Sequence, residues 1–149
     1  MSNLVELDWK GPFRYLEKGL EAVGDGPHWA TAPDLKAIRN RPAIYLFCVD
    51  HPIHGHQALA YIGRSSRAGG RLDQHEEWLR REWTVSVYAA QCPKEHLEAV
   101  EGLLIYAHSP IYNGNGVGSP KAWNTLHVRN VGRFWGLFPD VLASHPWNI

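Results

Sequence analysis

A carboxylate in an apolar helical face is the first residue of this chain that suggests chemistry. The stretch 93–108 predicts a helix, because one proline stands where a helix can begin and a second follows its end. At about 100° per residue, Glu101 falls inside the apolar arc formed by Leu97, Val100 and Leu104. A carboxylate in such a position must be paired, hydrogen-bonded or bound to a metal ion. Two interpretations stay open: a metal ligand, or a glutamate at the core edge that pairs with an arginine.

A second helical pattern, from Arg71 to about Glu82, carries a basic pair. Arg71 and His75 are four residues apart and therefore project from the same helical face. A guanidinium beside an imidazole does not attract it when the histidine is charged, so a shared anion would explain the pairing. The alternative is two exposed polar residues on a solvated face.

The elements that must position these residues indicate an α+β fold. Strands are predicted at 43–49, 58–63 and 84–89, where β-branched and aromatic residues gather. With the two helices, the order is β-β-α-β-α, which is not a regular βαβ alternation. We therefore expect a small mixed or antiparallel three-stranded sheet flanked by helices. The aromatic-rich last thirty residues are expected to hold at most one short strand or helix.

The motifs together resemble the GIY-YIG nuclease superfamily. The two strand motifs are Ala43-Ile44-Tyr45 and Tyr61-Ile62-Gly63, and Arg71 follows eight residues after that glycine. His75 comes one turn later, and Glu101 is followed by Pro110 and Asn113 in the family's order. Ala43 stands where the family usually has glycine. The resemblance covers about 42–113, so we expect one domain, 1–149, with a GIY-YIG-like core and extensions at 1–41 and 114–149.

This resemblance implies a metal-dependent endonuclease that hydrolyses DNA phosphodiester bonds. It implies one Mg²⁺ (or Mn²⁺) ion per active site, held by Glu101, since Mg²⁺ can be bound by one carboxylate together with water and substrate phosphate. Tyr45 would accept the proton of the attacking water, and Arg71 would hold the phosphate. His75 would relay a proton or contact the phosphate.

Four further residues complete the implied site. Tyr61 would hydrogen-bond the phosphate or the water, and Asn113 would orient active-site groups or simply form a turn before Gly114. Arg64 and Arg67 are expected to contact the DNA backbone. A free-standing enzyme of a restriction system or mobile element is favoured. The alternatives are a repair nuclease for single-stranded or structured DNA, and a non-catalytic nucleic-acid-binding module of the same fold. Double-strand cutting would require a homodimer or two successive cuts.

Composition excludes a strongly basic nucleic-acid binder and a membrane protein. The 149 residues hold 15 Lys and Arg and 15 Asp and Glu, so the net charge is zero. No apolar run approaches the roughly 18 residues of a membrane helix, and no secretory signal is present, so we expect a cytoplasmic protein. Charge is uneven, however: 1–35 is acidic, whereas 64–81 carries five arginines against three acids.

Three other patterns have less weight. Cys48 and Cys92 lie in or beside apolar stretches and are interpreted as reduced core thiols. Three histidines in the loop 50–57 are accompanied by no cysteine and by no carboxylate beyond Asp50, so a zinc site is not favoured. The tryptophans and phenylalanines of the chain ends could stack on nucleic-acid bases, but closure of the core is the favoured interpretation.

Overall fold

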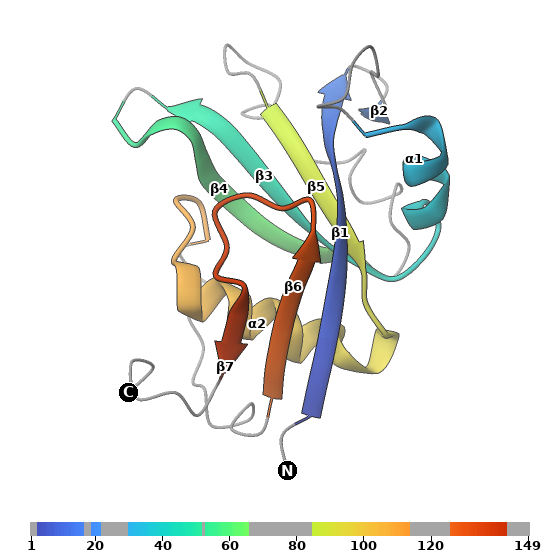
Figure 1. Cartoon of the computed structure of the whole chain (residues 1–149). Helices are drawn as coiled ribbons and strands as arrows, with labels where there is room; N and C mark the ends of the chain where they lie inside the picture. The colour runs from blue at the N-terminus through green and yellow to red at the C-terminus, as the bar shows by residue number, and fades with distance from the viewer. Residues whose placement is uncertain are drawn as a thin grey trace.

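The computed structural model describes residues 3–16, 19–21, 30–51, 53–65, 85–113 and 126–142 (Figure 1). These residues form seven strands, two α-helices and a short 3-10 helix at Lys94–His96. The strands are β1 (Asn3–Leu16), β2 (Gly19–Glu21), β3 (Ala43–His51), β4 (Gly55–Ser65), β5 (Val85–Gln91), β6 (Leu126–Gly132) and β7 (Asp140–Leu142). The helices are α1 (Ala32–Ile38) and α2 (Leu97–His108). In the described part of the chain no helix is long and apolar enough to cross a membrane.

All described strands belong to one mixed sheet. Its order is β4-β3-β5-β1-β6-β7, and β2 pairs with β1 outside this path. Every pairing is antiparallel except that of β1 with β6, which is parallel. The predicted α+β class is confirmed, and the three expected strands are β3, β4 and β5. The prediction of a three-stranded sheet is wrong in size, because both extensions add strands to it.

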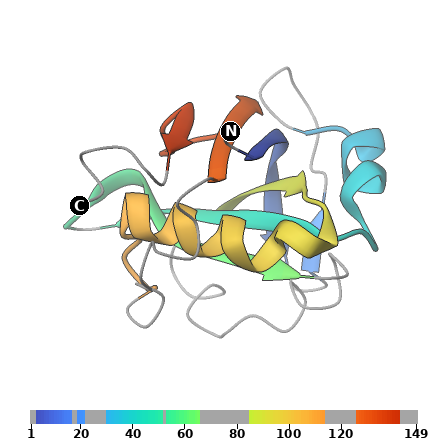
Figure 2. The same ribbon diagram turned by 90° about the horizontal axis from the view of Figure 1, so that it is seen from below.

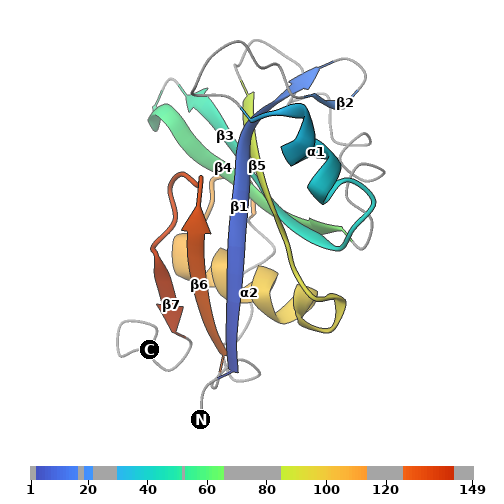
Figure 3. The ribbon, with the colours of Figure 1, turned by 45° about the vertical axis from the view of Figure 1, so that its right-hand side comes forward.

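The long strand β1 is the reason for the larger sheet (Figure 3). Val5, Leu7 and Trp9 are buried, whereas the intervening Glu6 and Asp8 are exposed. This period of two is that of a strand with one buried face. β1 pairs with β5 on one side and with β6 on the other, so it joins the two extensions to the middle of the chain. The C-terminal extension contains two strands, where at most one short element was expected.

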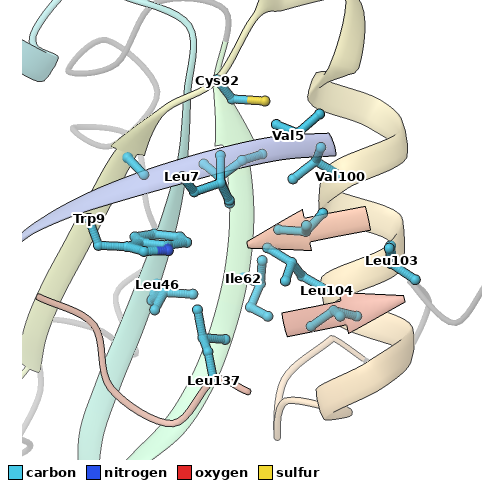
Figure 4. Close-up of a cluster of buried hydrophobic side chains, with 14 of the residues drawn as sticks. Val5, Leu7, Trp9, Leu46, Ile62, Cys92, Val100, Leu103, Leu104 and Leu137 are labelled. Atoms are coloured by element: carbon cyan, nitrogen blue, oxygen red, sulfur yellow. The ribbon is translucent and has the colours of Figure 1, made fainter. Parts of the chain in front are cut away.

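Two apolar cores lie on opposite faces of this sheet. The sheet curls around the larger core, and α2 lies across its strands to close that core (Figures 2 and 4). Leu46 and Ile62 enter it from β3 and β4, and Leu104 enters it from α2. The smaller core gathers Phe13, Tyr45, Phe47, Val87 and other buried residues against α1.

Helix α1 was not predicted, although its start carries a local signal. The Thr31 hydroxyl accepts a hydrogen bond from the Asp34 N–H at 3.3 Å, and the Asp34 carboxylate accepts one from the Thr31 N–H at 2.9 Å. This reciprocal cap fixes the first turn of the helix. Ile38 at its other end is buried in the smaller core.

Both cysteines are buried and free, as expected from the sequence. Desolvation raises the pKa of each thiol to about 12. Since the thiolate is the reactive form, both side chains act as inert core groups at neutral pH.

Candidate functional site

The two strand motifs bring Tyr45, Tyr61 and Gly63 together on the α1 face of the sheet. In the antiparallel pair of β3 and β4, Tyr45 lies opposite Gly63 and Phe47 lies opposite Tyr61. The ring centroid of Tyr45 is 5.3 Å from that of Phe47 and 6.3 Å from that of Tyr61. Tyr45 is fully buried, at 0% exposure, whereas Tyr61 is partly exposed. Tyr61 is therefore the phenol of this pair that solvent reaches.

Gly63 leaves the space that the Tyr45 phenol occupies. A Cβ atom added at position 63 would lie 2.5 Å from the Tyr45 hydroxyl oxygen and 2.5 Å from its Cε2. No real Cβ atom tolerates so close an approach, and the Tyr45 ring is packed in the core. The glycine of the second motif is thus a steric requirement of the tyrosine in the first.

Glu101 lies with Arg64 on the other face of the sheet. An Arg64 guanidinium nitrogen (Nη1) is 3.5 Å from a Glu101 carboxylate oxygen (Oε1). The Glu101 side chain is 21% exposed and that of Arg64 is 41% exposed, so water reaches both groups. Pairing with an arginine was one of the two interpretations of this carboxylate. Arg64 was expected to contact the DNA backbone. In this structure, which holds no nucleic acid, its guanidinium pairs with the Glu101 carboxylate.

The candidate residues therefore form two groups that lie on opposite faces of the sheet. Tyr45 belongs to the core beneath α1, whereas α2, which carries Glu101, covers the other core. Alternation along β4 likewise places Gly63 and Arg64 on opposite faces. β4 is the edge strand of the described sheet, so a substrate could contact both groups only by passing around this edge.

Asn113 attaches the segment after α2 to the same edge strand. Its amide oxygen accepts a hydrogen bond from the Ile62 N–H at 2.8 Å, and its amide nitrogen donates one to the Ile62 carbonyl at 3.0 Å. The backbone N–H groups of Ile111 and Tyr112 donate to carbonyls of β4 as well. Asn113 therefore closes the turn after α2 with its backbone N–H, which donates to the Pro110 carbonyl at 3.3 Å, and binds β4 with its side chain. These side-chain bonds attach the end of α2 to Ile62, the middle residue of the second motif.

Arg67, Arg71 and His75 lie outside the described residues. The predicted helix from Arg71 to Glu82 lies outside them too. Of the eight sequence-predicted site residues, the structure therefore positions five.

The histidine-rich hairpin between β3 and β4 holds no metal-ligand cluster. The His51 Nδ1 atom accepts hydrogen bonds from the N–H groups of Ile53 and His54, both at 3.1 Å, and so closes the turn. His56 pairs with Asp50 at 2.7 Å. A hydrogen bond from the Gln57 N–H lowers the pKa of Asp50. No group of three or more potential metal ligands occurs within the described ranges.

The aromatic residues between β6 and β7 divide between core and solvent. Phe134 packs against the larger core, as expected for an aromatic that closes it. Trp135 and Phe138, in contrast, are 50% and 60% exposed, so core closure is the wrong interpretation for these two. Trp123 and Trp147 lie outside the described residues. In the sequence, buried Leu137 lies between the two exposed aromatic residues. Its apolar side chain was the available sequence signal that this segment is anchored in the core.

His108 is a further residue that sequence reasoning did not identify. Its Nδ1–H donates to the Leu104 carbonyl at 2.8 Å, and its Nε2 accepts a hydrogen bond from the Phe138 N–H at 2.9 Å. This pattern requires a neutral ring with its proton on Nδ1. Burial lowers the pKa of His108 and so favours the neutral form. The available signal was its place in the last helical turn, four residues after a core leucine.

Comparison of the chain with protein-family models, with curated proteins and with solved structures finds no match.

Proposed function

We propose that this chain is a metal-dependent endonuclease that hydrolyses DNA phosphodiester bonds. The observation that carries the proposal is the Arg64–Glu101 pair beside the edge of the sheet. A solvent-accessible carboxylate next to a guanidinium offers a ligand for a divalent cation and a fork for phosphate oxygens. The resemblance to GIY-YIG nucleases, which rests on the order and spacing of the motifs, adds support from the sequence.

The residues present are compatible with Mg²⁺ as the metal. Mg²⁺ keeps several waters and is commonly held by one or two carboxylates with substrate phosphate, so Glu101 is a sufficient protein ligand. When bound, the ion would supply positive charge near the leaving oxygen. Arg64 would then transfer its contact from the Glu101 carboxylate to the scissile phosphate. Without ligand, the Glu101 and Arg64 charges are paired with each other. With ligand bound, Glu101 would be paired with the ion and Arg64 with the phosphate.

The phenols have different roles in this proposal. Tyr61 is accessible to solvent and would hydrogen-bond the phosphate or the attacking water. Tyr45 is buried, so its role as proton acceptor would require substrate binding at the β4 edge to open access to its hydroxyl. Arg71 and His75 are proposed to hold the phosphate and relay a proton, as the resemblance implies. Asn113 would act as a positioning residue through Ile62.

A cleavage assay with a matched pair of variants tests the proposal. Plasmid and single-stranded DNA are incubated with Mg²⁺ or Mn²⁺ and with wild type, Glu101→Gln or Glu98→Gln. Glu98 is exposed on the same helix, three residues earlier, so its substitution controls for loss of a surface charge. We expect Glu101→Gln to lower the cleavage rate by at least about 100-fold, the scale of removing one electrostatic catalytic group, and Glu98→Gln to retain the rate. Equal rates for wild type and Glu101→Gln would overturn the catalytic proposal.

The second candidate is a non-catalytic nucleic-acid-binding module. Two observations favour it: Tyr45 is fully buried, and Glu101 is already paired with Arg64. Such a module would bind oligonucleotides without cutting them in Mg²⁺ or Mn²⁺. Replacing Glu101 and Arg64 together by apolar residues would then remove no cleavage activity. A nuclease would lose cleavage in the same double variant.

A further inference from the structure

We propose that Arg64 holds the Glu101 carboxylate as an internal counter-ion and leaves it when a divalent cation binds there. Cation and phosphate then each raise the affinity of the chain for the other. This inference rests on the proposed function, because it adds a coupling between the two ligands of the same site. It predicts opposite effects when Arg64 is lost: cation binding becomes stronger, and phosphate binding becomes weaker.

The backbones that carry the two charges are fixed by the larger core. Arg64 lies opposite Ile44 in the pair of β3 and β4, and Ile44 is fully buried in that core. On α2, Val100 precedes Glu101 and Leu104 follows it by three residues, and both are fully buried in the same core (Figure 4). The apolar neighbours therefore set the position of each charged residue. The ion pair can separate while the sheet and α2 stay in place.

The charged ends of the two side chains form only a loose contact. The Arg64 Nη1 atom is 3.5 Å from the Glu101 Oε1 atom, which is longer than the roughly 2.7–3.2 Å of an ordinary N–H···O hydrogen bond. The side chains are 41% and 21% exposed, so water screens their attraction. Ion pairs of such exposure change an equilibrium by at most about fivefold. The contact is thus weak enough for a ligand to displace it.

A guanidinium and a divalent cation compete for the same carboxylate. Mg²⁺ binds carboxylate oxygens directly, so an Arg64 guanidinium that stayed on Glu101 would lie beside a doubly charged ion. Repulsion between the two positive charges favours departure of the guanidinium. Its planar fork of donors matches the oxygens of a phosphate, which gives the released group a new partner.

The ion pair has to separate only once, whichever ligand binds first. The second ligand then meets a group that is already released, so its affinity is higher than for the paired chain. By linkage, the cation raises phosphate affinity by the same factor as phosphate raises cation affinity. The strength of the ion pair limits this part of the coupling to about fivefold.

Binding of Mn²⁺ without nucleic acid tests the competition for Glu101. Free Mn²⁺ is measured by electron paramagnetic resonance during titration of wild type and of three variants. We expect Arg64→Gln to bind Mn²⁺ about two- to fivefold more tightly than wild type and Glu101→Gln to lose this binding. Arg41 is an exposed arginine two residues before β3, so Arg41→Gln controls for the loss of a positive charge and should leave the affinity unchanged.

Binding of a labelled DNA duplex in EDTA tests the release of Arg64. Fluorescence anisotropy is measured for wild type, Glu101→Gln, Arg64→Gln and the double variant. We expect Glu101→Gln to strengthen binding about two- to fivefold, because the guanidinium is freed for phosphate. In the Arg64→Gln background the same substitution should change the affinity by less than about 1.5-fold, since no guanidinium remains to be released.

Three outcomes would overturn the inference. The first is Mn²⁺ affinity in Arg64→Gln that is equal to or below that of wild type. The second is an equal gain from Glu101→Gln in both backgrounds, which would mean that the carboxylate merely repels phosphate. The third is the absence of duplex binding by all four proteins. Thermal unfolding of each variant checks that the substitutions leave the fold intact.

The proposed function can fail separately. If wild type cuts no DNA with Mg²⁺ while both binding experiments give the expected differences, the nuclease proposal fails and the counter-ion inference stands. If cleavage depends on Glu101 while Arg64→Gln leaves Mn²⁺ affinity unchanged, the reverse holds.

Discussion

Tyr45 and Gly63 show how one position can depend on the absence of a side chain at another. The phenol fills the space above the glycine, and its neighbours Phe47 and Tyr61 pack beside it. Glycine carries an entropic cost within a strand, so its presence in β4 requires a compensating reason. Here the reason is the close approach of the aromatic ring.

Gly63→Ala should destabilise the chain by about 1–3 kcal/mol, because the added methyl overpacks a closed core. Urea unfolding measures the loss. A double-mutant cycle provides the control: in a Tyr45→Ala background the same substitution should cost less than about 1 kcal/mol. An equal cost in both backgrounds would mean that the clash involves something other than the Tyr45 ring.

At the scale of elements, α2 is held to the sheet at both its middle and its end. Glu101 pairs with Arg64 of β4, and His108 accepts a hydrogen bond from the Phe138 N–H, in the segment between β6 and β7. Asn113 then returns the chain to β4. The end of this helix is therefore connected to two sheet segments that are distant in sequence.

The His108 contact predicts a pH-dependent stability. Burial lowers the pKa of His108 in the folded chain, so the unfolded chain takes up the proton first as pH falls below about 6.5. The stability due to the neutral ring is complete above that value and is lost as pH falls toward the lower folded pKa. Urea midpoints between pH 7.5 and 5 should decrease for wild type and stay flatter for His108→Gln, which keeps a neutral acceptor.

Two parallel declines in wild type and His108→Gln would assign the effect to other groups. The pKa values of Asp34, Asp50 and Asp140 are lowered by their hydrogen bonds. Their contributions are therefore lost only as pH falls below about 3.8, outside the tested window.

At the scale of the molecule, the two extensions are parts of a single sheet with the middle of the chain. β1 contributes Val5, Leu7 and Trp9 to the core that α2 closes, and β6 contributes Val128. A chain of residues 42–113 alone would lack these four side chains, so its larger core would be incomplete. We therefore expect the whole sheet to unfold cooperatively.

Substitutions in β6 test whether the whole sheet unfolds as one cooperative unit. Val128→Ala, at a fully buried position, should lower the free energy of unfolding by about 2 kcal/mol, whereas Val131→Ala, at a partly exposed position, should cost less than about 1 kcal/mol. Far-UV and near-UV circular dichroism should report one shared transition for both variants. Separate far-UV and near-UV transitions in Val128→Ala would indicate an extension that unfolds independently.

The three strands in the middle of the chain and α2 could be predicted from the sequence, whereas β1 and α1 in the N-terminal extension were missed. β3, β4, β5 and α2 lie where β-branched, aromatic or helix-periodic residues predicted them. β1 also alternates, with buried Val5, Leu7 and Trp9 between exposed residues. It was not predicted, because the intervening Glu6 and Asp8 are residues that are rare in strands. The parallel pairing of β1 with β6 depends on residues far apart in the chain, and no local propensity specifies it.

The candidate site was predictable in its parts and not in its arrangement. The polarity of Glu101 on an apolar helical face indicated a partner, and Arg64 is that partner. Alternation along β4 could have shown that Tyr61 and Gly63 lie on the face opposite to Arg64, but the placement of Tyr45 required the register of β3 with β4. The exposure of Trp135 could not have been predicted, because it lies in an irregular segment whose Phe138 carbonyl accepts a hydrogen bond from Asn130 and whose Phe138 N–H donates one to His108.

The central position of β1 has a consequence for how the protein is made. Its Trp9 contacts Asn130, which is 121 residues later in the chain. At a synthesis rate of about 5–20 residues per second, β1 waits roughly 6–24 s on the ribosome for its parallel neighbour. During that time a strand with an apolar face has an unpaired edge, which is a template for pairing with another chain. The charged residues that alternate along β1 would keep the nascent chain soluble until β6 arrives.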